Sequence, residues 1–445
     1  LYLDTRYDLW QPVDPMDQTP SDPLSQIKLV REFYETKDPL LGGIVDVMAE
    51  LTAAPIRNEG GSAELRALFD EWLYFIDVQN LAEQAATEYW LSGNVFITSY
   101  EDSARLTGII DSSNPIPVSF SILDPLTVQF DGVLTFGLTP KLKVDDSTRS
   151  FIERVMRGGT DEQKEALIVV YGKEFIEDVI AKKEYARIPP DRFYAYYNKK
   201  RSYQRYAFPP AGKALPWLQY KLRLRNLNLN TISNAISFII LVRLGSDKFP
   251  ATPEQIKQFR ELWKQRPRKN AASVFFQPHT TDIKIISPPE SAYQILREDI
   301  FHQPNEQIAQ AFGINLALIT GVSRASGIGY STAAIAMRST VRRIIIAQMK
   351  FERFLYTQYR KIGRALGFNL SEIPKPRHVS TGLENPKDMA IAFLHALDRG
   401  AVSMKTFMER GLGVDFYKEI EQKKWESEHG VEELFEMRGL SLIHI

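Results

Sequence analysis

The feature that most constrains this chain is a long run of helical sequence, residues 332–366, which follows a glycine-rich stretch at 321–331. When successive residues are rotated by about 100°, the run divides into two faces. Large apolar side chains share a sector of roughly 160–300°, measured from Arg338. They are Val341, Ile344, Phe351, Phe354, Leu355, Ile362 and Leu366. We therefore predict one helix of roughly 50 Å that packs along this face, at about 1.5 Å per residue.

The opposite face of the predicted helix is positively charged. Its basic side chains fall within a sector of roughly 0–140°. They are Arg342, Arg343, Lys350, Arg353, Arg360, Lys361 and Arg364. A run of like charges on a helix is usually a solvated surface. The alternative is that this face, or the loop before it, meets a polyanion.

Overall charge and cysteine content restrict the class of protein. Lysine plus arginine and aspartate plus glutamate both number 55, so the net charge is +0. A constitutive DNA-binding protein is usually basic overall, whereas a balanced chain can tolerate a moving polyanion without gripping it. The absence of cysteine excludes disulfides, thiolate metal sites and cysteine nucleophiles, and favours a reducing compartment. The most apolar run, 236–242, is too short to span a bilayer, so we expect a soluble protein with no membrane partner.

The first half of the chain divides into an arm and a mixed region. Residues 1–27 carry five aspartates and several prolines without a helical or strand period, which predicts an extended arm. Residues 28–212 change from helical spacings to strand-like runs, which predicts an α+β region. The expected helices are 63–76, 80–91 and 160–166, and the expected strands are 95–100, 118–123 and 126–130, with one more strand and a loop within 187–210.

The second half is predicted to be mostly helical. Residues 213–245 keep an apolar stripe at helical spacing, which predicts one helix ending at Gly245. A compact α/β insert, 246–290, follows, with a capped helix starting at Thr252; its expected strands are 273–277 and 282–286. The remaining segments are a helix at 291–315 kinked by Pro304, a loop at 316–331, the long helix at 332–368 and a helical region at 369–445. The fold class is thus a mostly helical α+β structure.

Catalytic and cofactor signatures are missing from the sequence. The glycines between 321 and 329 are not followed by the Gly-Lys-Ser/Thr of a phosphate loop. The six histidines never form an i, i+4 pair, and no Gly-x-Ser-x-Gly elbow occurs. We therefore assign no catalytic residue, no metal ligand and no cofactor. Residues 392–413 have the length and central glycine of a helix-turn-helix, which leaves an ordinary helical hairpin or a DNA-reading module as interpretations.

Several segments, taken in order, resemble the portal proteins of tailed bacteriophages. They are 305–314 (NEQIAQAFGI), 318–321 (LITG) and 329–332 (GYST) followed by the long helix, with 123–128 (LDPLTV) and 188–193 (IPPDRF) upstream. The resemblance implies a wing at 28–212, stem helices at 213–245 and 291–315, a clip at 246–290, a tunnel loop at 316–331 and a crown at 369–445. The last residues, 439–445, match no part of this pattern.

The resemblance also implies a function. Such a protein is a ring, typically of about twelve subunits, at one capsid vertex of the virion, assembled in the host cytoplasm. It passes double-stranded DNA and binds terminase, the major capsid and scaffold proteins, and a head-tail adaptor. The terminase motor would supply the ATPase, and the portal itself would not be an enzyme.

The residues expected at DNA are on or beside the tunnel loop: Ser323, Arg324, Tyr330 and Arg338. Those expected to face the adaptor or terminase are in the clip: Lys264, Arg266, Arg268 and Lys269. A second basic cluster, Lys221, Arg223 and Arg225, could face the channel or pair with a neighbour's acidic residues. The alternatives to a portal are a sequence-specific DNA-binding protein that uses 392–413, and an enzyme whose site the sequence does not reveal.

Overall fold

The computed structural model describes eight main stretches of the chain and several short ones. They are 19–102, 115–133, 137–236, 239–246, 248–264, 273–278, 298–314 and 330–379, with 394, 395, 397, 399, 403–408, 414 and 416–429. Within these stretches the chain is mostly helical and carries four small sheets, so the predicted mostly helical α+β class is confirmed. The chain divides into two compact units. The first comprises Leu1–Ser21, Glu32–Gly42 and Ala211–Val322, and the second comprises Asp22–Arg31, Gly43–Pro210 and Ser323–Ile445.

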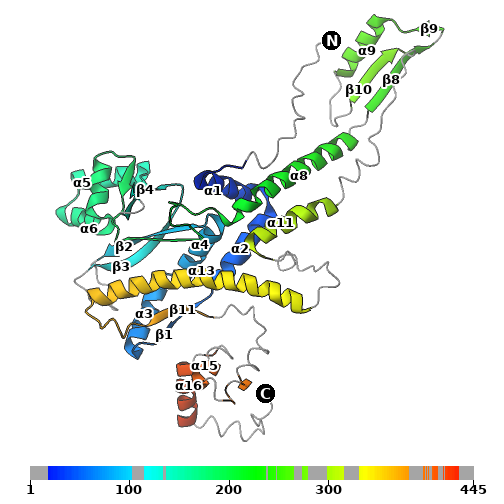
Figure 1. Cartoon of the computed structure of the whole chain (residues 1–445). Helices are drawn as coiled ribbons and strands as arrows, with labels where there is room; N and C mark the ends of the chain where they lie inside the picture. The colour runs from blue at the N-terminus through cyan, green and yellow to red at the C-terminus, as the bar shows by residue number, and fades with distance from the viewer. Residues whose placement is uncertain are drawn as a thin grey trace. The chain divides into compact units, whose positions relative to one another are not determined.

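The first unit is built around a pair of helices and a small α/β element (Figure 1). Its elements are the π-helix η3 (Phe33–Lys37), the 3-10 helices η4 (Pro210–Ala214) and η5 (Glu298–Phe301), helices α8 (Leu215–Ile236), α9 (Pro253–Lys264) and α11 (His302–Phe312), and strands β8 (Ile239–Ser246), β9 (Phe249–Pro250) and β10 (Ser273–Pro278). Helix α8 contacts α11, and both contribute fully buried side chains such as Leu218 and Phe312. Strand β8 pairs in parallel with β10 and antiparallel with β9, and α9 connects β9 to β10. The inserted element therefore lies, in sequence, between two helices that touch.

Two predictions for this unit need correction. Helix α8 ends at Ile236 and residues 239–246 form β8, so the helix predicted for 213–245 is wrong beyond 236. A short apolar run rich in β-branched residues suits a strand as well as a helix, and here β10 supplies a strand partner. Pro304 lies in the first turn of α11, which follows directly on η5, so among the described residues the helix predicted over 291–315 is α-helical only from His302 to Phe312. The kink at Pro304 stays a prediction. The capped start of α9 is confirmed, because the Thr252 and Gln255 side chains each accept a hydrogen bond from the other's backbone N–H.

The second unit contains three sheets and the long helix α13. Its helices are α1 (Pro23–Glu32), most of α2 (Pro39–Thr52), α3 (Ala63–Phe75), α4 (Val78–Leu91), α5 (Asp146–Gly158), α6 (Asp161–Tyr171), α7 (Lys173–Ile180), α13 (Tyr330–Ala365), α15 (Met404–Thr406) and α16 (Phe416–Glu428). Its strands are β1 (Ile56–Glu59), β2 (Asn94–Asp102), β3 (Ile116–Leu123), β4 (Val128–Val133), β5 (Gly137–Lys143), β6 (Tyr185–Arg187), β7 (Phe193–Tyr197) and β11 (Lys375–His378). The sheets have the orders β3-β2-β7, β4-β5-β6 and β1-β11, and all are antiparallel.

Helix α13 confirms the prediction of one long helix with a packed face. It spans 36 residues and contacts α4, β3 and β11, as Figure 1 shows for its course past α4 and the β2–β3 strands. The ring of Tyr359 stacks on Phe69 at 4.1 Å between centroids and meets Trp72 edge-on at 5.7 Å. One turn away, Phe354 packs edge-on against Phe120 at 5.3 Å. This aromatic cluster fixes α13 against the β3-β2-β7 sheet and α3.

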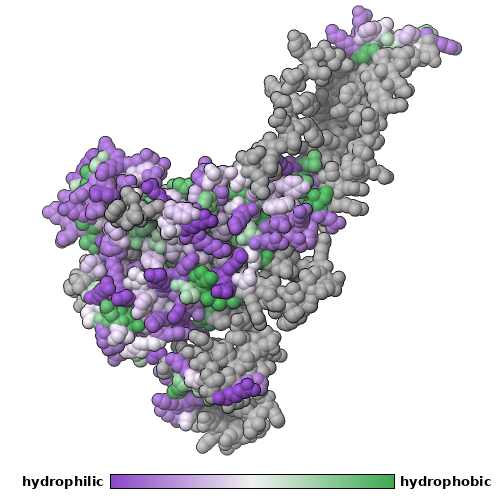
Figure 2. Space-filling model, in the orientation of Figure 1, coloured by the Kyte–Doolittle hydropathy of each residue, from purple (hydrophilic) through white to green (hydrophobic). Residues whose placement is uncertain are grey.

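Helices α5, α6 and α7 pack on one another and share a separate apolar cluster, and α7 contacts the β4-β5-β6 sheet through β6. The buried members of this cluster are Val144, Ile152, Leu167, Phe175, Ile176, Val179 and Ala186. The capping box predicted at the start of α6 is present, since Thr160 and Gln163 exchange side-chain to backbone hydrogen bonds. Figure 2 shows mainly hydrophilic residues over α5 and α6 on the visible face.

Two further expectations fail in the second unit. Helix α1 begins at Pro23, so the arm predicted over 1–27 is not extended at 23–27; residues 1–18 lie outside the described residues. The reason is local, because the Asp22 carboxylate accepts a hydrogen bond from the Ser25 N–H and proline suits the first helical position. In the region predicted to be wholly helical, 369–445, residues 375–378 form β11, which pairs with β1. The helical prediction there is met by α15 and α16 in the part that the structure describes.

Candidate nucleic-acid interface

Most of the sequence-predicted contact residues fall where the structure gives no side chain. Ser323, Arg324, Arg266, Arg268 and Lys269 lie outside the described residues. Tyr330 is the first residue of α13, Arg338 lies within α13, and Lys264 is the last residue of α9, and only the backbone of these three is described. The same holds for much of 392–413, of which 394, 395, 397, 399 and 403–408 are described. These sites stay predictions.

The basic face of α13 contains two different kinds of side chain. Lys361 is neutralised within its own chain: its ammonium group contacts the buried carboxylate of Glu101 and donates to the carbonyl oxygen of Asp191 at 3.1 Å. Arg192 approaches the same Glu101 carboxylate at 3.4 Å. This end of the helix is therefore an internal ion network, and the charge of Lys361 is balanced within the subunit.

Lys350 and Arg353, in contrast, face an open groove between α13 and the chain that follows β7. The groove has a volume of about 560 Å³. It is lined by Tyr194, Ala195, Tyr196, Tyr197, Lys199, Lys200, Lys350, Arg353 and Thr357. Strand β7 ends at Tyr197, and Lys199 then takes a left-handed backbone conformation with φ 54°. The turn places two consecutive lysines beside the two basic residues of α13.

Lys350 is half-buried and has only neutral partners among the described residues. Its ammonium group donates to the backbone carbonyl of Tyr197 and to the Tyr89 hydroxyl at 3.2 Å, and lies 5.1 Å from the centre of the Tyr89 ring. Burial lowers the pKa of Lys350, and the positive charge of Lys199 lowers this pKa further. Burial also raises the pKa of Tyr89 to about 12, so the tyrosine does not serve as a counter-anion.

Lys200 and Arg353 complete the positive surface of the groove. Lys200 lies 4.2 Å from the centre of the Tyr197 ring and donates to the carbonyl oxygen of Gln204 at 3.0 Å. Burial lowers the pKa of Lys200 as well. Arg353 is exposed. None of Lys200, Lys350 and Arg353 has an ion pair with a described carboxylate.

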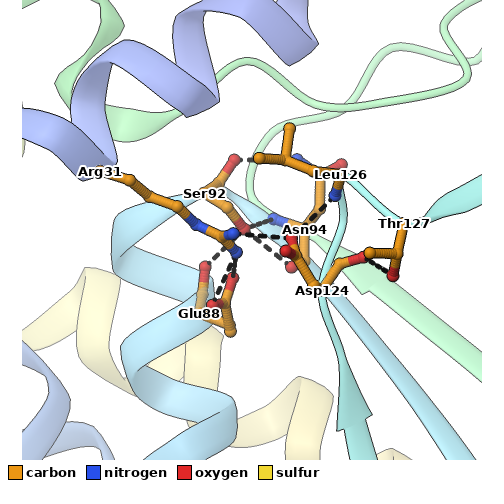
Figure 3. A network of polar contacts seen from close by, with 7 residues as sticks. All are labelled: Arg31, Glu88, Ser92, Asn94, Asp124, Leu126 and Thr127. Carbon is orange, nitrogen blue, oxygen red and sulfur yellow. Dashed lines mark hydrogen bonds and ion pairs between the residues drawn. The ribbon is translucent and has the colours of Figure 1, made fainter. Parts of the chain in front are cut away.

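Arg31, another basic residue of this unit, shows how a buried cation is paired with carboxylates within the subunit. Figure 3 shows Arg31 of α1 between two carboxylates. Its guanidinium group donates to Glu88 of α4 at 3.0 and 3.2 Å and to Asp124 at 2.6 Å. Asp124 also accepts from the Leu126 N–H at 2.8 Å, which fixes the turn between β3 and β4. Lys200 and Lys350 have no such carboxylate among the described residues, and this difference marks the groove as the candidate site.

Comparison with known proteins gives similarity to chains of gene transfer agent particles. No protein-family model matches the chain, and no curated protein matches it either. Similar solved structures include a chain of a native gene transfer agent virion, with 15% identity, a TM-score of 0.47, and coverage of 89% of this chain and 94% of that chain. A second is from the neck of an empty gene transfer agent particle computed with C6 symmetry, with 15% identity, a TM-score of 0.49, and coverage of 89% and 94%. A third is from the neck of the native particle computed with C12 symmetry, with 15% identity, a TM-score of 0.47, and coverage of 86% and 92%.

Two other kinds of site are missing from the described part of the chain. No group of three or more histidine, aspartate or glutamate side chains there is placed to hold a metal ion. No helix in that part is both long and apolar enough to cross a membrane.

Sequence reasoning missed half of the groove. Lys350 and Arg353 were on the predicted basic face, but Lys199 and Lys200 were not singled out. The available signal was the run Lys199-Lys200-Arg201, which begins two residues after the end of an aromatic strand. The pairing of β7 with β2, and the contact of the same sheet with α13, bring the two basic segments together.

Proposed function

We propose that this chain is the subunit of a phage-type portal: a closed ring of about twelve copies at one capsid vertex, through which double-stranded DNA passes. The observation that carries the proposal is the order of elements along the chain from α8 to α13. Helices α8 and α11 contact each other and bracket the α/β insert β8–β10, and the 36-residue helix α13 follows. This is the order of stem, clip, stem and long helix that the sequence resemblance implies.

Exposed apolar side chains in the first unit are the candidates for contacts between copies. Tyr220 and Leu229 of α8 are 40% and 55% exposed, and Phe249 of the insert is 79% exposed. Single exposed apolar side chains are normal on protein surfaces, and in the proposed ring these three would lie where copies meet. A head-to-tail contact between two different patches closes into a ring when the rotation between subunits divides the circle.

One member of the second basic cluster, Lys221, Arg223 and Arg225, is neutralised within its own subunit. Lys221 of α8 pairs with the buried Asp38 carboxylate at 2.7 Å. Lys221 is therefore not one of the residues that we assign to DNA. Arg223 and Arg225 are exposed on the same helix.

In the proposed ring, Ser323, Arg324, Tyr330 and Arg338 approach the duplex, and Lys264, Arg266, Arg268 and Lys269 face the adaptor or terminase. Each contact would be weak, because an exposed ion pair contributes about 0–1 kcal/mol. Repetition around the ring makes many weak contacts multivalent while leaving the duplex free to slide. Phosphate contacts also carry no sequence information, as a conduit for any genome requires. The subunit would have no catalytic role, and terminase, capsid and scaffold proteins would be its partners in the virion.

The absence of cysteine from the chain permits a clean test of loop convergence. In Arg324→Cys every subunit carries one thiol, and a short bis-maleimide should join neighbouring loops in pairs, which gives a cross-linked dimer on a denaturing gel. Tyr203→Cys is the control, because Tyr203 is 63% exposed but lies in the wing region. It should give far less cross-linking. If the Arg324→Cys protein is oligomeric yet yields no more cross-linked dimer than the control, the loops do not converge on an axis.

The role of Arg324 itself needs a second experiment. In a packaging reaction that uses this chain, Arg324→Ala should alter the rate or the length of DNA packaged. Unchanged rate and length would show that Arg324 does not contact the moving duplex. A loss of ring assembly in Arg324→Ala would instead assign Arg324 to a salt bridge between subunits.

A further inference from the structure

We propose that the groove lined by Lys199, Lys200, Lys350 and Arg353 binds the phosphodiester backbone of DNA, as a second DNA contact separate from the tunnel loop. The inference rests on the proposed function for the nearness of DNA, but its evidence is independent of the tunnel loop.

The first argument is the charge left unbalanced in the groove. Lys350 is half-buried against the neutral groups of Tyr89 and Tyr197, and Lys200 is partly buried against Tyr197 and Gln204. Removing a cation from water is costly unless an anion or strong acceptors replace the water. Burial lowers the pKa of both lysines, as expected for ammonium groups whose solvent has not been replaced by a negative charge. An anion in the groove would supply that charge.

The second argument concerns which part of a nucleic acid fits. Base stacking needs a free aromatic face, and the groove tyrosines do not offer one. Tyr196 is 7% exposed, Tyr194 packs on Phe354 at 5.2 Å, and the Tyr197 ring is contacted edge-on by Phe96 at 5.8 Å and over its face by the ammonium group of Lys200. The cationic side chains are therefore the binding groups, and they recognise backbone phosphates.

The third argument is the density of charge. Four basic residues surround about 560 Å³, which is too small for a duplex but accommodates a short stretch of one strand's backbone. Each strand of duplex DNA presents one negative charge per roughly 3.4 Å of the helix axis, so a strand that crosses the groove brings successive phosphates to these cations. Phosphate oxygens can bind both kinds of group in the groove. The guanidinium of Arg353 is a planar donor of hydrogen bonds, and the ammonium groups of the lysines act as point charges.

The test measures binding of a fluorescent duplex by anisotropy over a series of salt concentrations. The groove variant is Lys200→Gln/Arg353→Gln. The matched control is Arg360→Gln/Arg364→Gln, which removes the same charge from exposed positions of α13 outside the groove. Two duplexes of unrelated sequence should bind equally, because phosphate contacts are not sequence-specific.

The groove variant should bind more weakly by on the order of tenfold for each basic side chain removed, as expected for charge-assisted hydrogen bonds. Its plot of log affinity against log salt should be shallower by about 0.9 for each phosphate that is no longer neutralised. The control should stay close to the unmodified protein. Equal weakening in the control would mean that charge on the whole face attracts DNA, and an unchanged groove variant would mean that the groove binds no phosphate; either result overturns the proposal.

A native mass measurement on the same samples separates this inference from the proposed function. Weaker DNA binding with an intact ring supports the groove site. If the groove variant keeps its DNA affinity but loses ring assembly, the groove holds an acidic segment of a neighbouring copy and the assignment to DNA is wrong. If the unmodified protein forms no ring, the portal proposal fails, while the comparison of groove and control variants still decides the groove.

Discussion

The Arg31 network offers a sharp test of how the second unit is held together (Figure 3). Arg31 joins α1 to α4 through Glu88 and to the β3–β4 turn through Asp124. The Arg31 and Glu88 side chains are 17% and 19% exposed, whereas Asp124 is 41% exposed. Arg31→Ala therefore leaves the nearly buried Glu88 carboxylate without a counter-charge. The Asp124 carboxylate also loses its partner, but water can still solvate it.

The expected cost follows from those exposures. Removing one partner of a buried ion pair costs about 3–5 kcal/mol, and an exposed pair contributes about 0–1 kcal/mol. Because the pair is not completely buried, we expect Arg31→Ala to lower the free energy of unfolding by about 3 kcal/mol at pH 7. Arg31→Met is the control for the lost aliphatic stem, which packs independently of the charge.

The pH dependence distinguishes charge from packing. Burial raises the pKa of Glu88 above its ordinary value, and the Arg31 charge and hydrogen bonds oppose that rise. Without Arg31 the pKa of Glu88 rises further. A carboxyl group whose pKa is higher in the folded state destabilises the fold increasingly as pH rises above its unfolded value. The difference between the unmodified protein and Arg31→Ala should therefore grow from pH 4 to pH 7.

The assay is urea unfolding at fixed protein concentration, because association contributes to apparent stability. Native-state hydrogen exchange of the Leu126 amide, which donates to Asp124, reports the same loss locally. Glu88→Gln added to Arg31→Ala should recover part of the stability, since no buried charge is then left without a partner. A loss below 1 kcal/mol that does not change with pH would refute the reasoning.

Three further substitutions test other parts of the second unit. Asn94→Ala should lower the free energy of unfolding by about 2–3 kcal/mol and speed amide exchange at Ala207. The reason is that the buried Asn94 side chain accepts a hydrogen bond from the Ala207 N–H at 2.8 Å and donates one to its C=O at 3.0 Å. Unchanged exchange would contradict this. Thr160→Ala should cost about 1 kcal/mol in urea unfolding by removing the cap of α6, and no loss would mean that the cap is replaced by water. Asp178→Asn should cost about 3 kcal/mol at pH 7, because the Asp178 carboxylate, 3% exposed, pairs with Arg187 at 2.7 Å. Burial works to raise the pKa of Asp178, but hydrogen bonds from Arg187 and Lys183 hold this pKa well below its usual range. The stability that this ion pair contributes is present above the pKa of Asp178 in the unfolded chain and is lost as pH falls through its pKa in the folded protein. The cost of Asp178→Asn should therefore shrink in acid. A cost that stays constant with pH would contradict the ion pair as its cause.

Elements with a strong local signal could be predicted from the sequence. Helix α13 repeats its apolar face over about seven turns, from Val341 onward, and the starts of α6 and α9 are each defined by a threonine and a glutamine three residues later. These features depend on neighbours a few residues apart. They could be predicted because no distant segment overrides them.

Elements that exist only through distant contacts could not be predicted. Strand β11 reads Lys-Pro-Arg-His, with no alternation, and it is a strand because β1 pairs with it. The His378 side chain of this strand is 2% exposed and is held by Glu352 of α13, whose carboxylate contacts both the backbone N–H and the ring of His378. The boundary between α8 and β8 was missed for the same reason, since β10 decides it.

The groove, too, exists only through contacts between segments that are distant in the sequence. Lys200 and Lys350 are far apart in sequence, and their spacing carries no signal of a shared site. What brings them together is the packing of the sheet that contains β7 on α13. The long basic helix indicated a polyanion partner, but the residues that face it became identifiable only when Lys361 was seen to be neutralised and Lys350 was not.

The central claim, that this chain forms a portal ring, is tested most directly by native mass spectrometry of the purified protein. The account predicts a single dominant assembly with a mass of about twelve times the 50.9 kDa chain, and negative-stain images of the same sample should show rings with an axial opening. A mass of 50.9 kDa, or of a dimer, that persists at high protein concentration would contradict it.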